Sequence, residues 1–158
     1  MAKGGGKAKK KVAVPQAGVS RDSKRTGDPA SLLPGSSGSN ERVCWRFTHV
    51  DHEGRWSFDR MDTATLGDVL RKLADFETMT LNDLRTQPGR FTEYELPSGL
   101  CKEALARLSD LGHDGMTRIQ RFRFTGTQRL YGFLEGNVFH VLWWDPKHEV
   151  YPSSLKHT

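Results

Sequence analysis

The clearest alternation of apolar and polar positions lies in the last third of the chain. It predicts three β-strands, which span Ile119–Phe124, Arg129–Phe133 and Val138–Trp144. Gly126 lies between the first and second of these strands, and Glu135-Gly136-Asn137 lies between the second and third. Such residues tolerate the positive φ angles of tight hairpins. The last run is nearly all apolar, as in a strand that is buried on both faces. We therefore expect an antiparallel meander of three strands.

A second alternating pattern lies nearer the N-terminus, at residues 42–50, where Val43 and Trp45 share one face. The polar sequence Asp-His-Glu-Gly follows and is typical of a turn. Residues 55–58 then alternate again and are expected to return as a second strand. The pattern predicts a hairpin in which Trp45 and Trp56 are neighbours across the two strands.

Helical periodicity separates these two regions. Thr65 is a good N-cap, and the residues after it place an apolar stripe on one side of a helix. The stripe consists of Leu66, Val69, Leu70, Leu73 and Phe76. Thr80 is expected to cap a second, shorter helix that contains Leu81 and Leu84.

Residues 87–95 contain Pro88-Gly89 and are expected to form a loop. Another helix is expected from Pro97 to Gly112, since glycine commonly ends helices. The order of elements predicts an α+β fold. In this fold an antiparallel sheet, made of the N-terminal hairpin and the C-terminal three-stranded meander, packs one face against two main helices.

Composition divides the chain at about residue 40. Residues 1–40 are rich in Gly, Ser, Pro and Lys, contain no aromatic residue, and carry eight basic and two acidic side chains. Their net charge is +6 and that of the whole chain is +5, so residues 41–158 sum to −1. Such a composition cannot bury enough apolar surface to offset chain entropy. We expect a disordered basic tail at 1–40 and a single α+β domain at 41–158.

The tail leaves two interpretations open. Its lysines can bind polyanions by counterion release, without any choice of sequence, or they can simply keep the protein in solution. No apolar segment follows the lysines as in a signal peptide, and no apolar run has the roughly 18 residues of a membrane helix. We therefore expect a soluble, cytoplasmic protein with no membrane partner. Cys44 and Cys101 are expected to be ordinary core residues rather than a disulfide.

Two groups of polar residues in the last third of the chain can carry chemistry. The first is a positive stripe whose guanidinium groups match phosphate oxygens, and it consists of Arg118, Arg121, Arg123 and Arg129. The second follows the last strand and consists of Asp145, His148 and Tyr151. Histidine is suited to proton transfer because its ordinary pKa is about 6.5. The alternative in each case is an ordinary solvated surface.

No cofactor motif is present, and neither a cofactor nor a metal is expected. His49, Asp51 and His52 contain metal-binding side chains. Their place in a predicted turn explains their polarity equally well.

The chain resembles the RelE/ParE superfamily of toxins from toxin–antitoxin systems. The resemblance lies in the order of its elements, in which helices precede a three-stranded meander with arginines, and a His and a Tyr follow the meander. The resemblance implies a ribonuclease that cuts mRNA, on the ribosome, without a metal. It implies catalytic roles for His148, Tyr151 and Arg129. It also implies that Arg118, Arg121, Arg123 and Lys147 bind nucleic acid. RNA or the ribosome would be the partner, and a small antitoxin protein would be a second one.

A different class of function stays open beside this one. The same arginines would serve a non-catalytic module, of a mobile element, that holds nucleic acid or a partner protein. Geometry separates the two hypotheses. Convergence of His148, Tyr151 and at least two arginines in one concavity favours the enzyme, whereas their dispersal over a flat face favours the binding module.

Overall fold

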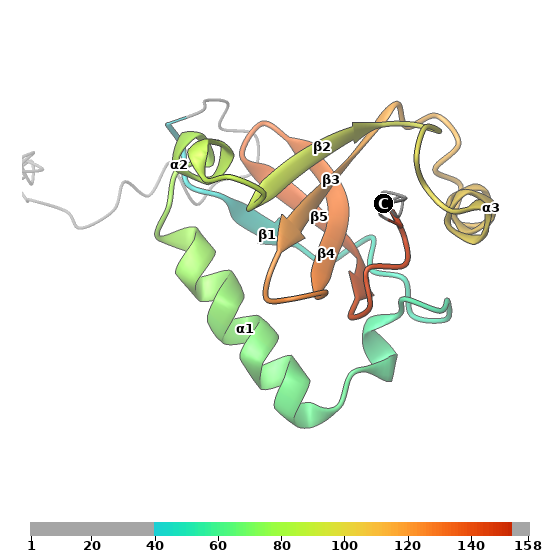
Figure 1. The fold of residues 1–158 in the computed structure, drawn as a ribbon, viewed down its shortest axis with the longest axis horizontal. Helices are drawn as coiled ribbons and strands as arrows, with labels where there is room; N and C mark the ends of the chain where they lie inside the picture. The colour runs from blue at the N-terminus through green and yellow to red at the C-terminus, as the bar shows by residue number, and fades with distance from the viewer. Residues whose placement is uncertain (1–39, 153–158) are drawn as a thin grey trace, which may run out of the picture.

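The computed structural model describes residues 40–152, and the expectation of a disordered tail concerns residues that lie outside this range, except for residue 40. Five strands, three α-helices and one 3-10 helix follow one another (Figure 1). In chain order they are β1 (Cys44–Arg46), η2 (Phe58–Arg60), α1 (Thr63–Glu77), α2 (Leu81–Thr86), β2 (Phe91–Glu95), α3 (Lys102–Asp110), β3 (Arg118–Arg123), β4 (Arg129–Glu135) and β5 (Val138–Asp145).

The five strands form one sheet in the order β1-β5-β4-β3-β2. The expected antiparallel meander of β3, β4 and β5 is confirmed, and β2 adds to it in antiparallel orientation. Only β1 is parallel to its neighbour, β5. The α+β class is therefore confirmed, with a sheet that is mostly antiparallel.

The expected N-terminal hairpin is wrong. The chain leaves the sheet after Arg46, and Asp51 then organises a compact turn by accepting hydrogen bonds from the backbone N–H groups of Glu53 and Gly54, each at 3.0 Å. Trp45 and Trp56 are not neighbours, because they belong to different apolar clusters. Alternation alone could not show that β1 would pair with a strand about ninety residues later.

The expected loop at residues 87–95 is also wrong in its second half, which forms the edge strand β2. Its apolar residues pair with those of β3, Phe91 with Phe122 and Tyr94 with Ile119. The strand is short and half polar because its glutamates lie at the exposed edge of the sheet. This composition hides a strand from a search for apolar alternation.

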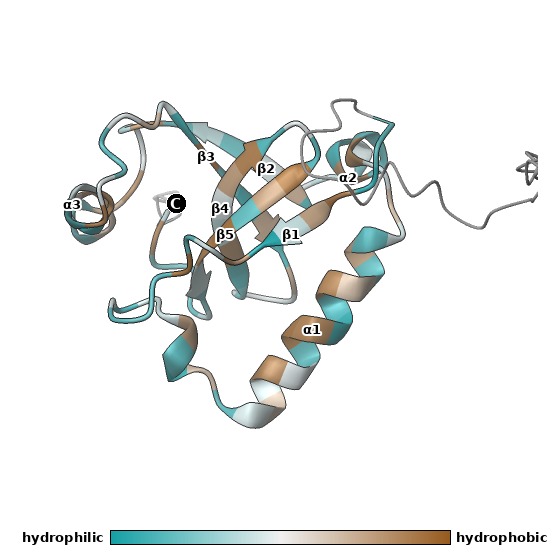
Figure 2. Ribbon diagram, turned by 180° about the vertical axis from the view of Figure 1, so that it is seen from behind, coloured by the Kyte–Doolittle hydropathy of each residue, from teal (hydrophilic) through white to brown (hydrophobic). Residues whose placement is uncertain are grey.

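Helices cover both faces of the sheet, in contrast to the single covered face that we expected (Figure 1). α1 and α2 pack on one face and α3 on the other. Apolar and polar residues alternate along α1 (Figure 2), and two leucines of its predicted stripe, Leu66 and Leu70, are 41% and 54% exposed. The helix begins earlier than predicted, because the Asp62 side chain accepts a hydrogen bond from the Thr65 N–H at 2.7 Å.

The strand β5 supplies apolar side chains to both faces, as its sequence predicts. A β-bulge leaves Leu142 without a partner on β4, since Tyr131 pairs with Trp143 and Gly132 with Val141. As a result Leu142 and Trp143 both belong to the α3-side cluster, whereas Val141 faces α1.

Replacing Leu142 by Ala is expected to lower the free energy of unfolding by about 2–5 kcal/mol, the usual cost of truncating a buried leucine. Leu142 has no exposed surface. Chemical denaturation of the two proteins measures the difference. The matched control is Leu70→Ala, at an exposed position, where a change within about 0.5 kcal/mol is expected. Equal effects of the two changes would contradict the buried position of Leu142.

Candidate phosphate-binding site

Arginine side chains gather on the α3 side of the sheet, where β3 and β4 meet. Alternation along β3 sends Phe122 and Phe124 into the α1-side core and Arg121 to the opposite face. Arg129 of β4 lies beside it, and the two are only 9% and 7% exposed. Residues 145–151 cross the same face and bring His148 to Arg121. The structure therefore brings together two of the predicted arginines and the predicted histidine.

Arg121 is held by neutral partners. Its Nη2 donates to Thr92 Oγ1 at 3.0 Å, its Nη1 lies 3.3 Å from His148 Nε2, and its Cζ lies 5.5 Å from the centre of the Tyr94 ring. Within residues 40–152 no carboxylate lies within 4.0 Å of Arg121 or Arg129. A buried charge is costly unless it is paired. The two guanidinium groups thus form no ion pair with a described carboxylate, although the buried Asp145 is the cross-strand neighbour of Arg129.

Several buried donors at this site also have no partner within the described part of the chain. They are Nε of Arg121, Nε of Arg129 and the hydroxyl of Tyr131. Burial, together with the charges of Arg121 and Arg123, lowers the pKa of Arg129. Burial raises the pKa of Tyr131, so its hydroxyl keeps its proton. An anion such as phosphate could accept hydrogen bonds from these donors and form ion pairs with the two guanidinium groups.

His148 is positioned by a tight turn and has a positive φ of 60°. The carboxylate of Asp145 accepts hydrogen bonds from the backbone N–H groups of Lys147, at 3.2 Å, and Val150, at 2.8 Å. Burial and the charges of Arg129 and Arg121 lower the pKa of His148, although Asp145 opposes them. The imidazole is therefore neutral at pH 7. Because arginine can only donate, Nε2 is the unprotonated nitrogen of this neutral ring.

Tyr151 reaches the site indirectly. Its ring stacks on Tyr94, with centres 4.0 Å apart and planes inclined by 17°. A Cβ added at Gly99 would collide with the same ring. Tyr151 is thus enclosed by packing, and it supports Tyr94, which in turn lies beside Arg121.

The other predicted residues lie at the edge of the site or outside it. Arg123 is exposed and is the cross-strand neighbour of Arg129. Lys147 is exposed as well, and its backbone N–H bonds to Asp145. Arg118 faces the opposite way along β3 and forms an ion pair with Glu93 at 3.0 Å.

Thr92, Tyr94 and Tyr131 complete the site, and sequence reasoning missed them. Thr92 and Tyr94 lie on β2, the strand that was expected to be a loop. Their alternation with Glu93 and Glu95 was the available signal. Tyr131 lies two residues after Arg129 on β4, so alternation along that strand was the signal that places it on the same face.

The residues considered for a metal site point to different partners. Asp51 binds Arg107 and Trp143, His52 lies 3.0 Å from Asp59, and the His49 ring contacts His113 and His140. Between residues 40 and 152 no three His, Cys, Asp or Glu side chains are arranged to hold a metal ion.

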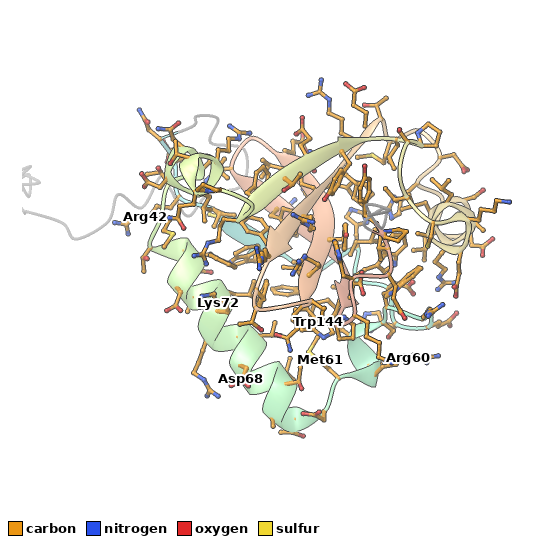
Figure 3. All side chains as sticks on the ribbon, in the orientation of Figure 1. Arg42, Arg60, Met61, Asp68, Lys72 and Trp144 are labelled. Atoms are coloured by element: carbon orange, nitrogen blue, oxygen red, sulfur yellow. The ribbon has the colours of Figure 1, made fainter. Side chains whose placement is uncertain are left out.

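Two hollows lie elsewhere on the surface. One, of about 450 Å³, lies between α3 and the chain segments before and after it, where Leu108 and Met116 line it. The other, of about 240 Å³, lies between α1 and the β3–β4 turn and is lined by Asp68, Lys72 and Trp144, among others (Figure 3). Neither is lined by Arg121, Arg129 or His148.

Of the helices in the described range, none combines the length and the apolar character needed to cross a membrane. Comparisons of the sequence and the structure with protein-family models, curated proteins and solved structures found no match.

Proposed function

We propose that the protein is a metal-independent ribonuclease that cuts mRNA in association with the ribosome, as the resemblance to RelE/ParE toxins implies. The convergence of two buried arginines that form no ion pair among the described residues with a neutral histidine supports this proposal most strongly. Guanidinium groups match phosphate oxygens, and a neutral imidazole can accept a proton. The proposal places the protein in the cytoplasm, with a small antitoxin protein as a second partner.

The chemistry needs the substrate, these side chains and water. When the scissile phosphate takes over the N–H of Arg121, Nε2 of His148 accepts the proton of the RNA 2′-hydroxyl, and the 2′-oxygen attacks the adjacent phosphorus. An O2′–P bond forms and the P–O5′ bond breaks, which leaves a 2′,3′-cyclic phosphate. The 5′-oxygen takes a proton from water, and His148 returns its proton to the hydroxide that remains. Arg121 and Arg129 stabilise the negative charge that develops on the phosphoryl oxygens. Tyr151 acts through its packing on Tyr94.

Cleavage of end-labelled RNA by the full chain tests the proposal, with and without ribosomes and in excess EDTA. We expect fragments that end in a 2′,3′-cyclic phosphate, and no effect of EDTA. RNA with 2′-O-methyl groups is the matched control and should stay intact, because its 2′-oxygen cannot attack. Absence of cleavage of every RNA, both with and without ribosomes, would refute the ribonuclease.

One observation favours the alternative, a non-catalytic module that binds nucleic acid. Tyr151, for which the resemblance also implies a catalytic role, is packed against Tyr94. His148 is then the only predicted acid–base residue that contacts the arginines. RNA binding without cleavage is the result that this alternative predicts.

A further inference from the structure

A second set of arginines lies at the same end of the sheet, outside the site described above. It consists of Arg85 of α2, Arg90 just before β2, and Arg123 at the end of β3, and we name it the arginine rim. Figure 1 shows the start of β2 beside the end of β3, close to α2. The rim therefore combines side chains from three elements that are separate in the sequence.

Backbone contacts connect the rim to the phosphate-binding site. The N–H of Arg123 donates to the carbonyl of Arg90 at 2.8 Å. On its other side Arg123 is the cross-strand neighbour of Arg129. Arg123 thus lies between the buried pair on the α3 side and Arg90, whose guanidinium, like that of Arg85, lies over a ring of the α1-side cluster at the same end of the sheet.

Aromatic rings support two members of the rim. The Cζ of Arg85 lies 5.8 Å from the centre of the Phe91 ring, and that of Arg90 lies 5.6 Å from the centre of the Phe76 ring. A guanidinium over a ring keeps the N–H donors at its edge available while its position is fixed. These side chains are therefore ordered in advance for an anionic ligand.

No acidic side chain neutralises the rim within residues 40–152, since no carboxylate lies within 4.0 Å of its three guanidinium groups. The nearest acidic residues in the sequence are engaged elsewhere. Asp83 caps α2 through Thr80, and Glu93 binds Arg118 and Gln120. Like charges on neighbouring strands are unfavourable. A ligand that carries several negative charges would remove this repulsion.

We infer that the arginine rim binds the phosphates that flank the scissile phosphate, so that the substrate is a single-stranded RNA segment rather than a dinucleotide or a duplex. The inference rests on the proposed function. It follows from the continuity of the rim with the site and from the burial of Arg121 and Arg129. A phosphate reaches such recessed side chains only from a strand that bends freely, as unpaired RNA does.

Binding of a 12-nucleotide RNA tests the inference separately from catalysis. All 2′-positions of this RNA carry O-methyl groups, so that it cannot be cut, and fluorescence anisotropy measures affinity at several salt concentrations. Arg85→Gln, Arg90→Gln and Arg123→Gln should each weaken binding about tenfold, the scale of one charge-assisted hydrogen bond. Each should also reduce the slope of log affinity against log salt by about 0.7.

The matched control is Arg71→Gln on α1, where the arginine is exposed and bound to Asp68 at 2.7 Å. Its affinity and slope should equal those of the wild type, and thermal unfolding checks that all variants fold. A second arm measures binding of a 2′-O-methyl dinucleotide, which has a single phosphate. The rim variants and the wild type should bind it equally weakly, because it has no flanking phosphate for the rim to hold.

Unchanged slopes in all three rim variants would overturn the inference. So would a dependence on the rim that is equal for duplex and single-stranded RNA, or binding to phosphatidylserine vesicles that the RNA does not displace. A wild type that binds the 12-mer through the rim but cuts no RNA would refute the proposed ribonuclease and leave the rim established.

Discussion

His148→Ala is expected to slow RNA cleavage by about 10²–10⁴-fold, the usual contribution of a positioned acid–base group. The imidazole lies 3.3 Å from Arg121, and its Nε2 is the unprotonated nitrogen, the acceptor that the proposed proton transfer needs. Alanine removes this acceptor but keeps both arginines. Single-turnover cleavage of end-labelled RNA measures the loss, and anisotropy should show RNA binding nearly unchanged.

The matched control for this change is His52→Ala, since His52 is exposed and contacts only Asp59 among the described residues. It should cut RNA at the wild-type rate. Equal rates for His148→Ala and the wild type would remove His148 from the mechanism. The pH profile gives a second test. Burial and the charges of Arg129 and Arg121 lower the pKa of His148. Wild-type kcat/KM should therefore rise with pH and reach its plateau at a pH below about 6.5, the ordinary pKa of histidine.

Asp51→Ala is expected to lower the free energy of unfolding by about 3–5 kcal/mol, the cost of removing one partner from a buried ion pair. Asp51 has almost no exposed surface, and Arg107 binds both of its oxygens, at 2.6 and 2.8 Å. Trp143 also donates to it at 3.1 Å. Alanine leaves these donors without their acceptor. Denaturation in urea measures the change.

The pH dependence of stability provides an independent check on Asp51. Burial opposes its ionisation, but the hydrogen bonds from Arg107, Glu53, Gly54 and Trp143 outweigh burial and hold the pKa well below its usual range. Because the folded pKa is depressed, the stabilisation is present above the unfolded pKa of about 3.9 and is lost as the pH falls through the folded value. Asp51→Ala should therefore lose less stability in acid than the wild type.

Asp59→Ala is the matched control for Asp51→Ala. Its carboxylate is exposed, and His52 is the only described side chain with which it forms a hydrogen bond. We expect its unfolding free energy to stay within about 0.5 kcal/mol of the wild type. If Asp51→Ala were equally mild, the ion pair with Arg107 would contribute little to the fold.

The meander was predictable because its runs and its turns indicate the same strands. The positions of Arg121 and Arg129 on one face also follow from alternation once β3 and β4 are recognised. The apolar run of β5 even indicates that both faces of the sheet are covered.

The rest depends on contacts between distant residues. Arg107 lies 56 positions after Asp51, and nothing local to either residue predicts their pairing. β1 is a strand only because β5 accepts it as a parallel neighbour. Tyr94 belongs to the site because it lies on the edge strand β2, and the glutamates of that strand hide its alternating pattern in the sequence. The contact between Arg121 and His148 likewise depends on the turn that Asp145 organises.

The place of β5 in the sheet sets when the site can form during synthesis. Ribosomes make chains from the N-terminus, and domains fold as units once their parts have emerged. β5 lies between β1 and β4, and the turn that follows it presents His148 to Arg121. A nascent chain that stops before residue 138 therefore has its arginines but neither the strand nor the histidine that completes the site. The activity proposed above would therefore require a chain that has been synthesised at least as far as His148.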